Sequence, residues 1–245
     1  MQYTAGLARP AFGPLSGQVS LDDTPPRNRL LASLDPTELE ALKPHLETWR
    51  LEQDDVLFEA NETITHVYFP ESVGVSLIED YNGRRTMAGT VGNEGMVGIG
   101  VFLGQDESAL HASTHLAGTA HRMTAATFRR MATAAGPLHQ LMLGYANAFL
   151  TQIIETHRCN GAHRVEQRCA RWLLLTCQRA DAVEFPLALE SLALVIGVKP
   201  GGVLLGLRSL QRRGLIEFRH SHVRVFDRRA LEENACECAR TVGVI

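Results

Sequence analysis

Basic side chains of the type that binds phosphate recur toward the C-terminal end of this 245-residue chain. Lys199, Arg212 and Arg213 are examples, and such cations neutralise nucleic-acid phosphates. Residues 158–229 hold 13 Lys+Arg against 6 Asp+Glu, whereas residues 1–157 hold 10 against 18. The net charge of −3 is thus divided into an acidic N-terminal part and a basic C-terminal part. This division favours a sensor domain joined to a nucleic-acid-binding domain. The less favoured interpretation is that the arginines only keep their helices soluble.

Histidine and cysteine side chains suggest metal or redox chemistry. His111 and His115 point to the same face if they lie on one strand, and His121 follows nearby. No Cys or carboxylate stands at ligand spacing beside them, so ordinary polar histidines are the favoured interpretation. Cys236 and Cys238 form a C-x-C pattern, which is weak evidence for a metal site by itself. We therefore assign no metal ligand, while a metal or redox sensor built on these residues stays an alternative.

The remaining composition narrows the class of protein. The chain has five cysteines, all in the last 90 residues, and an odd number argues against a framework of disulfides and for reduced thiols. Cys169 and Cys177 are expected in the core. No apolar run reaches the roughly 18 residues of a membrane span, and no signal peptide is recognised, so we expect a cytoplasmic protein without membrane association. No Gly-rich phosphate loop, paired carboxylates or nucleophile elbow is found, so we expect no enzyme and no catalytic residue.

The elements that must position these side chains change in type along the chain. Residues 1–26 are rich in Gly, Pro and Ser and predict a flexible lead-in. Asp35 marks the start of a short helix. From about residue 52 to residue 123, short alternating segments predict strands, and Asn82-Gly83 predicts a two-residue hairpin turn. This pattern is typical of a β-barrel or roll.

Residues 137–158 switch to helical periodicity, with an apolar face too wide for packing on one small sheet. We expect the same helix of a partner subunit to cover it, rather than burial wholly within one chain. Asn160-Gly161 then predicts a helix break and a hinge. The dimer helix is assigned to Leu138, Met142, Tyr145, Phe149 and Ile153, and a second apolar row holds Leu143, Ala146, Leu150 and Ile154.

The basic part of the chain predicts a winged helix. Residues 162–180 form an amphipathic helix, and residues 187–213 read as two helices around a turn at Gly197. The segment LIEFRHSHVRVFD, which begins at Leu215, then predicts two short strands around a His-Ser-His tip.

The order of these elements resembles the Crp/Fnr family of bacterial transcription regulators. Over roughly residues 27–240, the resemblance is carried by HVYFPESVGVSLIE, VGNEGMVGIGVFLG, HRVEQRCARWLLL and LQRRGLIEFRHSHVRVFDRRALEENACEC. It implies an α+β fold with an N-terminal double-stranded β-helix (jelly-roll-like) sensor domain, similar to cyclic-nucleotide-binding domains, then a long dimerisation helix and a C-terminal winged helix-turn-helix. The expected boundaries are a flexible segment at 1–26, the sensor at 27–136, the dimerisation helix and hinge at 137–160, the DNA-binding domain at 161–229 and a tail at 230–245.

The effector pocket implied by the resemblance departs from family members that bind cyclic AMP. Those members hold the ribose with a Glu and the cyclic phosphate with an Arg. The Arg slot falls here on His111 and the Glu slot near Ile99, and an imidazole cannot replace a guanidinium fork. We therefore do not expect cyclic AMP to bind, and the effector and any cofactor are unknown. The residues assigned to this pocket are Ile99, Gly100, His111, Ala112 and Ser113.

The recognition helix also departs from the family pattern. The base-reading slots fall on Pro200, Gly201 and Leu205, which offer no polar side chain, so direct base readout should be poor. The preceding helix lacks a side-chain cap near Ala188. Either the second helix starts late or its outer face meets something apolar. The residues assigned to DNA binding are Ser191, Lys199, Gly201, Gly202, Leu204, Leu205, Arg208, Arg212, Arg213, Ser221, His222 and Arg224.

The leading hypothesis is a homodimeric transcription regulator that senses an effector other than cyclic AMP and binds double-stranded DNA mainly through backbone contacts and shape. RNA polymerase is a further candidate partner, and the effector is an unidentified small molecule. One alternative is a degenerate member whose winged helix binds a protein through Leu204 and Leu205. The other alternative is the metal or redox sensor.

Overall fold

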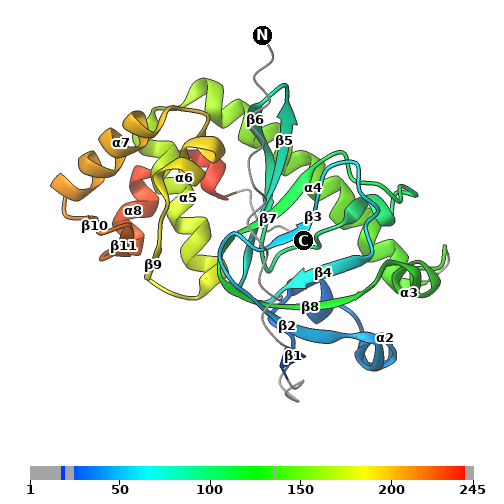
Figure 1. The fold of residues 1–245 in the computed structure, drawn as a ribbon. Coiled ribbons are helices and arrows are strands. Elements are labelled where there is room, and N and C mark those ends of the chain that lie inside the picture. The colour runs from blue at the N-terminus through cyan, green and yellow to red at the C-terminus, as the bar shows by residue number, and fades with distance from the viewer. Residues whose placement is uncertain (1–17, 20–24, 135, 241–245) are drawn as a thin grey trace, which may run out of the picture.

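The computed structural model describes residues 18–19, 25–134 and 136–240, which form two domains joined by one long helix (Figure 1). Most of the expected flexible segment 1–26, and residues 241–245 of the expected tail, lie outside the described residues.

The N-terminal domain contains two four-stranded antiparallel sheets, with strand orders β1-β2-β8-β4 and β3-β7-β5-β6. The strands of the first sheet are β1 (Gln18–Val19), β2 (Glu47–Leu51), β4 (His66–Pro70) and β8 (Gly118–Thr124). Those of the second are β3 (Val56–Phe58), β5 (Gly74–Tyr81), β6 (Arg84–Val91) and β7 (His111–Leu116).

An apolar core joins the two sheets and fixes their inner faces. Phe69 of β4 and Val75 of β5 are almost fully buried in one cluster that spans both sheets. Asn82 and Gly83 connect β5 to β6 with φ angles of 55° and 76°, as a tight hairpin turn requires. The expected roll and its hairpin are therefore confirmed.

Short helices close the ends of this roll. Asp35 begins the second of them, and its carboxylate accepts hydrogen bonds from the backbone N–H groups of Thr37 and Glu38 at 2.9 and 3.0 Å. This confirms the predicted helix start. The short helices are α1 (Arg29–Ala32), α2 (Pro36–Leu42), η1 (Lys43–His45), η2 (Ile99–Val101) and α3 (Ala125–Met131).

The long helix α4 (Pro137–Ala162) crosses the N-terminal domain and continues to the start of the C-terminal domain (Figure 1). Leu138, Met142 and Tyr145 are buried in the core of their own chain, and the Tyr145 hydroxyl donates to the Met96 carbonyl at 2.9 Å. The predicted break at Asn160-Gly161 is wrong by two residues. Asn160 remains helical, and its side chain donates to the Val195 carbonyl of the next domain at 3.1 Å.

The C-terminal domain is a winged helix-turn-helix built around the helix α5. Its core, centred on Leu173, Leu192 and Leu207, is shared by all its main helices. The elements are α5 (Val165–Ala180), β9 (Glu184–Pro186), α6 (Leu189–Ile196), α7 (Pro200–Arg212), β10 (Ile216–Arg219), β11 (His222–Val225), α8 (Arg228–Asn234) and η3 (Glu237–Arg240), with sheet order β10-β11-β9.

A buried ion pair connects the two domains. Arg179 of α5 reaches Glu94 in the loop after β6, with Nη2 to Oε1 at 2.6 Å, and also donates to the Thr90 hydroxyl at 2.9 Å. The arginine stem passes directly over Gly92, where a Cβ atom would lie 2.3 Å from Arg179 Cδ. Burial would raise the pKa of Glu94, but the charge and hydrogen bonds of Arg179 outweigh it and lower this pKa.

Candidate nucleic-acid interface and neighbouring sites

The helix pair α6 and α7 has helix-turn-helix geometry. Gly197 ends α6 in the left-handed region, with φ of 66°, and the two helices meet at an angle of 96°. No side chain caps α6 at Ala188, as expected. Among the described residues no single helix is long and apolar enough to cross a membrane, and only the bent pair of α6 and α7 passes that test by length and composition.

One face of α7 packs inside the domain. Val203, Leu207 and Leu210 repeat at helical spacing in the sequence, and all three are fully buried. Gly206 lies on this face against α5, where an added Cβ atom would come within 2.9 Å of the Cys169 sulfur. Glycine is therefore required at this position by the close approach of two helices, and it is not evidence for or against DNA contact.

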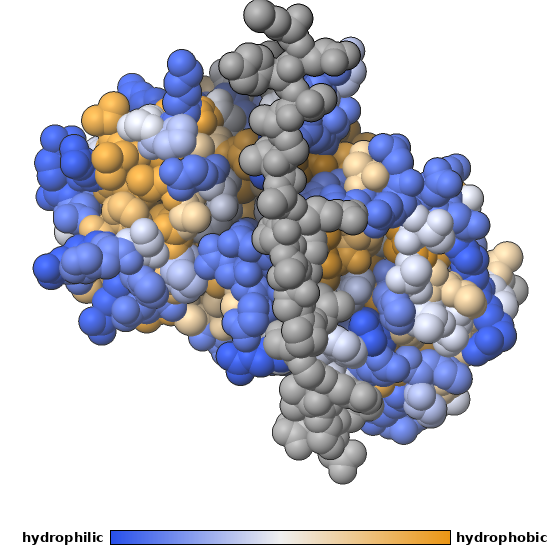
Figure 2. All heavy atoms as spheres, viewed as in Figure 1, coloured by the Kyte–Doolittle hydropathy of each residue, from blue (hydrophilic) through white to orange (hydrophobic). Residues whose placement is uncertain are grey.

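Over its first two turns, the opposite face of α7 is exposed and carries no polar side chain. The helix starts at Pro200, so of the two alternatives a late start is wrong, and the two glycines of its first turn are helical. Gly201 has no neighbouring atom within 4 Å of its Cβ position, and Leu205 is 68% exposed. Figure 2 shows apolar atoms gathered over this α6–α7 part of the domain. The surface expected to read bases is thus apolar, as the sequence indicated.

Basic side chains lie just before α7 and along its C-terminal half. Lys199 at the start of α7, Arg208 and Arg212 are exposed, and none makes an ion pair with another described residue. Arg213 differs because its Nη1 lies 3.1 Å from the Glu166 carboxylate of α5. Lys199, Arg208 and Arg212 are therefore the better placed of these cations for phosphate contacts.

The wing carries the remaining residues assigned to DNA binding. His220 and Ser221 form its two-residue tip with φ angles of 49° and 58°, and His222 and Arg224 are exposed on β11. Arg224 Nε lies 3.9 Å from the Glu184 carboxylate of β9, so its charge is partly offset. Ser191, in contrast, is only partly exposed on α6.

The residues assigned to the effector pocket lie in two places. Ile99 and Gly100 form the start of η2, while His111, Ala112 and Ser113 lie on β7. Ala112 is fully buried in the core between the sheets, and His111 Nδ1 pairs with the Glu59 carboxylate at 2.7 Å. The His111 imidazole thus already has an acidic partner where a cyclic phosphate would need a cation.

The three histidines considered as metal ligands, His111, His115 and His121, have separate partners. His115 is buried beside Ser76 and Trp172, and His121 lies between Thr48 and Glu71. Burial and, to a lesser extent, the Arg179 charge lower the pKa of His115 to about 3. The described residues bring no two of these histidines into one ligand group, so shared metal ligation by His111 and His115 is not supported.

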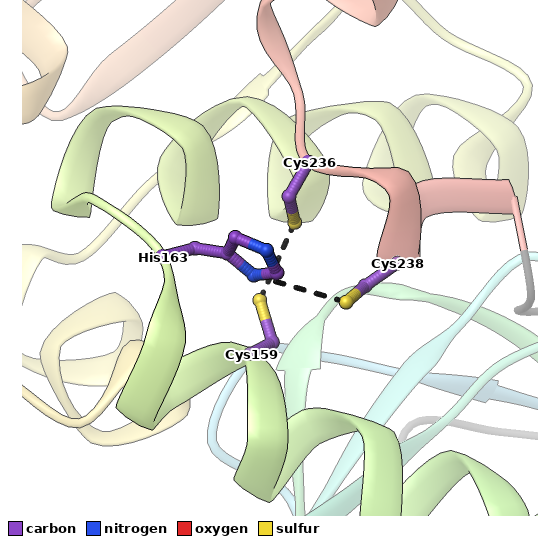
Figure 3. Close-up of side chains that lie close together, drawn as sticks. All are labelled: Cys159, His163, Cys236 and Cys238. Carbon is purple, nitrogen blue, oxygen red and sulfur yellow. Dashed lines mark hydrogen bonds between the residues drawn. The ribbon is translucent and has the colours of Figure 1, made fainter.

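Four other side chains do come together, at the far end of α4 (Figure 3). Cys159 and His163 from that end meet Cys236 and Cys238, which follow α8. The sequence singled out the last two, but it gave no reason to join them to Cys159 and His163, which are more than 70 residues earlier. A hydrogen bond with Cys236 is the main cause that lowers the pKa of Cys159 to about 5.

The fold and these surfaces define a class of protein. Residues 167–234 match the family of Crp-like helix-turn-helix domains. The C-terminal domain therefore belongs to that family, and the chain as a whole has the fold of Crp/Fnr-type transcription regulators.

Three solved structures illustrate the similarity. FixK2 from Bradyrhizobium japonicum has a TM-score of 0.65 at 15% identity, covering 77% of this chain and 96% of that one. TTHB099, a CRP-family transcriptional regulator from Thermus thermophilus, scores 0.63 at 16% identity, covering 76% and 95%. The c-di-GMP-responsive regulator CLP from Xanthomonas campestris scores 0.62 at 17% identity, covering 79% and 100%. No curated protein matches the sequence significantly.

Proposed function

We propose that this protein is a DNA-binding transcription regulator, and that it holds DNA mainly through phosphate contacts around an apolar recognition helix. The observation that carries the proposal is the position of Lys199, Arg208 and Arg212 on a Crp-like helix-turn-helix, exposed and without an acidic partner among the described residues. Cations at these places can position the helix on the duplex, although they read no base. Leu204 and Leu205 offer only apolar contacts, for example to thymine methyl groups.

Sequence preference in this proposal comes from the shape and deformability of DNA and from a two-fold site. The second copy of the protein would pack along α4. Leu143, Leu150 and Ile154 are 47, 58 and 59% exposed on that helix, whereas the residues first assigned to the dimer face pack largely against the roll. The partner surface is therefore the second apolar row rather than the first.

The effector that would control such a dimer is a ligand other than cyclic AMP. The pairing of His111 with Glu59 argues against a cyclic phosphate at that point. CLP, which has the same fold, is c-di-GMP-responsive, so this fold serves effectors other than cyclic AMP. The chain is proposed to act by binding and not as an enzyme.

DNA binding is tested on duplexes selected by the wild-type protein from genomic fragments, with a scrambled duplex beside them. We expect measurable affinity at about 50 mM salt that falls steeply with added salt. Arg212→Ala should weaken binding to both duplexes and reduce the slope of log K against log salt by about 1, because one phosphate contact is lost. Fluorescence anisotropy over a salt series measures both quantities.

Arg130→Ala is the matched control, because it removes one exposed arginine from α3 in the other domain. Its affinity and salt slope should equal those of the wild type. No detectable binding at about 50 mM salt, or equal effects of the two variants, would contradict the proposal. In that case the exposed Leu205 would favour the alternative of a protein-binding winged helix.

A further inference from the structure

The four side chains at the end of α4 have the geometry of a metal site (Figure 3). Their ligand atoms all lie within 4.8 Å of one another. The sulfur atoms of Cys159 and Cys236 are 3.4 Å apart, and the Cys238 sulfur is 3.8 Å from His163 Nδ1. Around a tetrahedral zinc ion, with bonds of about 2.3 Å to sulfur and about 2.0 Å to nitrogen, such atoms are separated by about 3.5–3.8 Å.

The backbone presents these atoms from two fixed places. Cys159 and His163 are one helical turn apart, and the backbone N–H of His163 closes α4 by donating to the Cys159 carbonyl at 3.1 Å. Cys236 and Cys238 stand on either side of Glu237 in the turn that starts η3, where Ala239 N–H donates to the Cys236 carbonyl at 2.9 Å. Both pairs are therefore held by backbone hydrogen bonds and need little movement to close on one ion.

The surroundings suit a metal bound by thiolates. All three cysteines are at most 3% exposed and form a cluster separate from both apolar cores. Glu237 lies 3.1 Å from His163 Nε2, which leaves Nδ1 facing the sulfur atoms, as in the carboxylate–histidine pairs that support metal ligands. Arg158 Nη2 lies 3.7 Å from the Cys238 sulfur, so a cation is present to offset three thiolates around a divalent ion.

We propose that Cys159, His163, Cys236 and Cys238 bind one Zn²⁺ ion in a closed tetrahedral site. Three thiolates and one imidazole form a donor set typical of structural zinc, and oxygen-preferring ions such as Mg²⁺ and Ca²⁺ would not select it. Ligand atoms this close together enclose a single ion and leave no room for an iron–sulfur cluster.

The position of the site gives the ion a structural role. Residues 164–235, which include the whole helix-turn-helix and wing, lie between the two ligand pairs. A bound ion would close this segment into a loop and hold the end of α4 against the end of the winged domain. Because the unfolded chain has no preformed site, zinc binding would stabilise the folded C-terminal domain.

The test uses the full-length chain, expressed in zinc-supplemented medium, freed from any affinity tag and purified without chelator. Mass spectrometry of the metal content should find about one zinc ion per chain, with every thiol reduced. After chelation, Co²⁺ titration of the same wild-type protein should give the intense visible bands of tetrahedral thiolate coordination. Zinc should then displace the cobalt. This second measurement needs no variant that has to fold.

Variants locate the ion. Cys236→Ala and Cys159→Ala should retain less than about a tenth of the wild-type zinc, because a closed four-ligand site loses a ligand. Cys177→Ala is the matched control, since this buried cysteine of α5 lies outside the cluster, and it should keep all the zinc. Glu237→Ala should bind zinc about 10–100-fold more weakly, because it removes the carboxylate that accepts from His163 Nε2.

Four results would overturn the proposal. The first is wild-type protein with reduced thiols that holds no zinc and gives no cobalt spectrum. The second is a disulfide among Cys159, Cys236 and Cys238 in the unreduced protein, although the nearest sulfur atoms are 3.4 Å apart against about 2.05 Å for that bond. The third is iron in place of zinc. The fourth is undiminished zinc in Cys236→Ala.

Discussion

At the residue scale, His115 is a histidine that the fold keeps uncharged. It lies on β7, 8% exposed, with Nδ1 hydrogen-bonded to the Ser76 hydroxyl at 2.9 Å and the Trp172 ring of the other domain beside it. Its Nε2 atom has no hydrogen-bond partner among the described residues. A proton on this ring would be a buried, unpaired charge, which the folded state disfavours.

This environment predicts a loss of stability in acid. The pKa of His115 is lowered to about 3 in the folded state, against about 6.5 unfolded, so the unfolded state takes up the proton first. The contribution of His115 to the free energy of unfolding is therefore complete above about pH 6.5, and it declines as the pH falls toward 3. At about pH 5 the free energy of unfolding should be about 2 kcal/mol lower than at about pH 7.5 from this residue alone.

Urea unfolding at the two pH values measures the effect. In His115→Gln, which cannot titrate, the loss between the two pH values should be smaller than in the wild type by about 2 kcal/mol. His222→Gln removes an exposed histidine from the wing and should keep the wild-type pH dependence. An identical loss in His115→Gln and wild type would show that His115 is not the group responsible.

At the element scale, α7 contains two kinds of glycine that the sequence alone does not distinguish. Gly206 faces α5, and its Cβ position lies 2.9 Å from the Cys169 sulfur and 3.2 Å from a methyl carbon of Val165. Gly201 faces open space in the first turn. Gly206 permits the close packing of α7 on α5, while Gly201 leaves a base-reading position of α7 without a side chain.

Alanine at these two positions should have opposite effects on stability. Gly206→Ala should lower the free energy of unfolding by about 1–2 kcal/mol, because overpacking against α5 exceeds the gain in helix propensity. Gly201→Ala should leave stability unchanged or raise it by up to about 1 kcal/mol. Urea midpoints at constant m-value measure both changes. A Gly206→Ala protein as stable as Gly201→Ala would mean that α5 and α7 are not so closely packed.

The apolar faces of α4 are likewise not distinguished by the sequence alone. Its periodicity predicted two apolar rows, and both exist. Leu138, Met142 and Tyr145 are buried by the roll of their own chain, while Leu150 and Ile154 stay exposed. Spacing shows that two faces are apolar, but it cannot tell which face the same chain covers, because that depends on how the helix lies across the sheets.

At the scale of the whole molecule, the exposed row of α4 predicts a dimer. Leu150→Glu should weaken self-association by about 30-fold or more, because a charge would be placed in the centre of an apolar interface. Analytical ultracentrifugation over a concentration series measures the dissociation constant. Leu103→Glu is the matched control, since Leu103 is also 59% exposed but lies in the sensor domain just after η2.

The control should associate as the wild type does, and both variants should keep the wild-type circular dichroism spectrum. A monomeric wild-type protein, or equal dimerisation of the two variants, would contradict this assignment of the dimer surface.

The sequence by itself determined the type and order of the elements, because these follow from local patterns. The alternation of residues 52–123, the Asn82-Gly83 turn and the helical spacing of Val203, Leu207 and Leu210 each act over a few residues and reappear in the structure. The apolar character of the recognition face was equally readable, since it depends only on which residue types occupy α7.

Only the tertiary structure decided which distant residues meet. The pairing of Glu94 with Arg179, the covered face of α4 and the gathering of Cys159 and His163 with Cys236 and Cys238 join segments tens of residues apart. No local spacing encodes these contacts. They arise because the packing of α5 against the roll, and of the chain after α8 against the end of α4, brings those segments together in space.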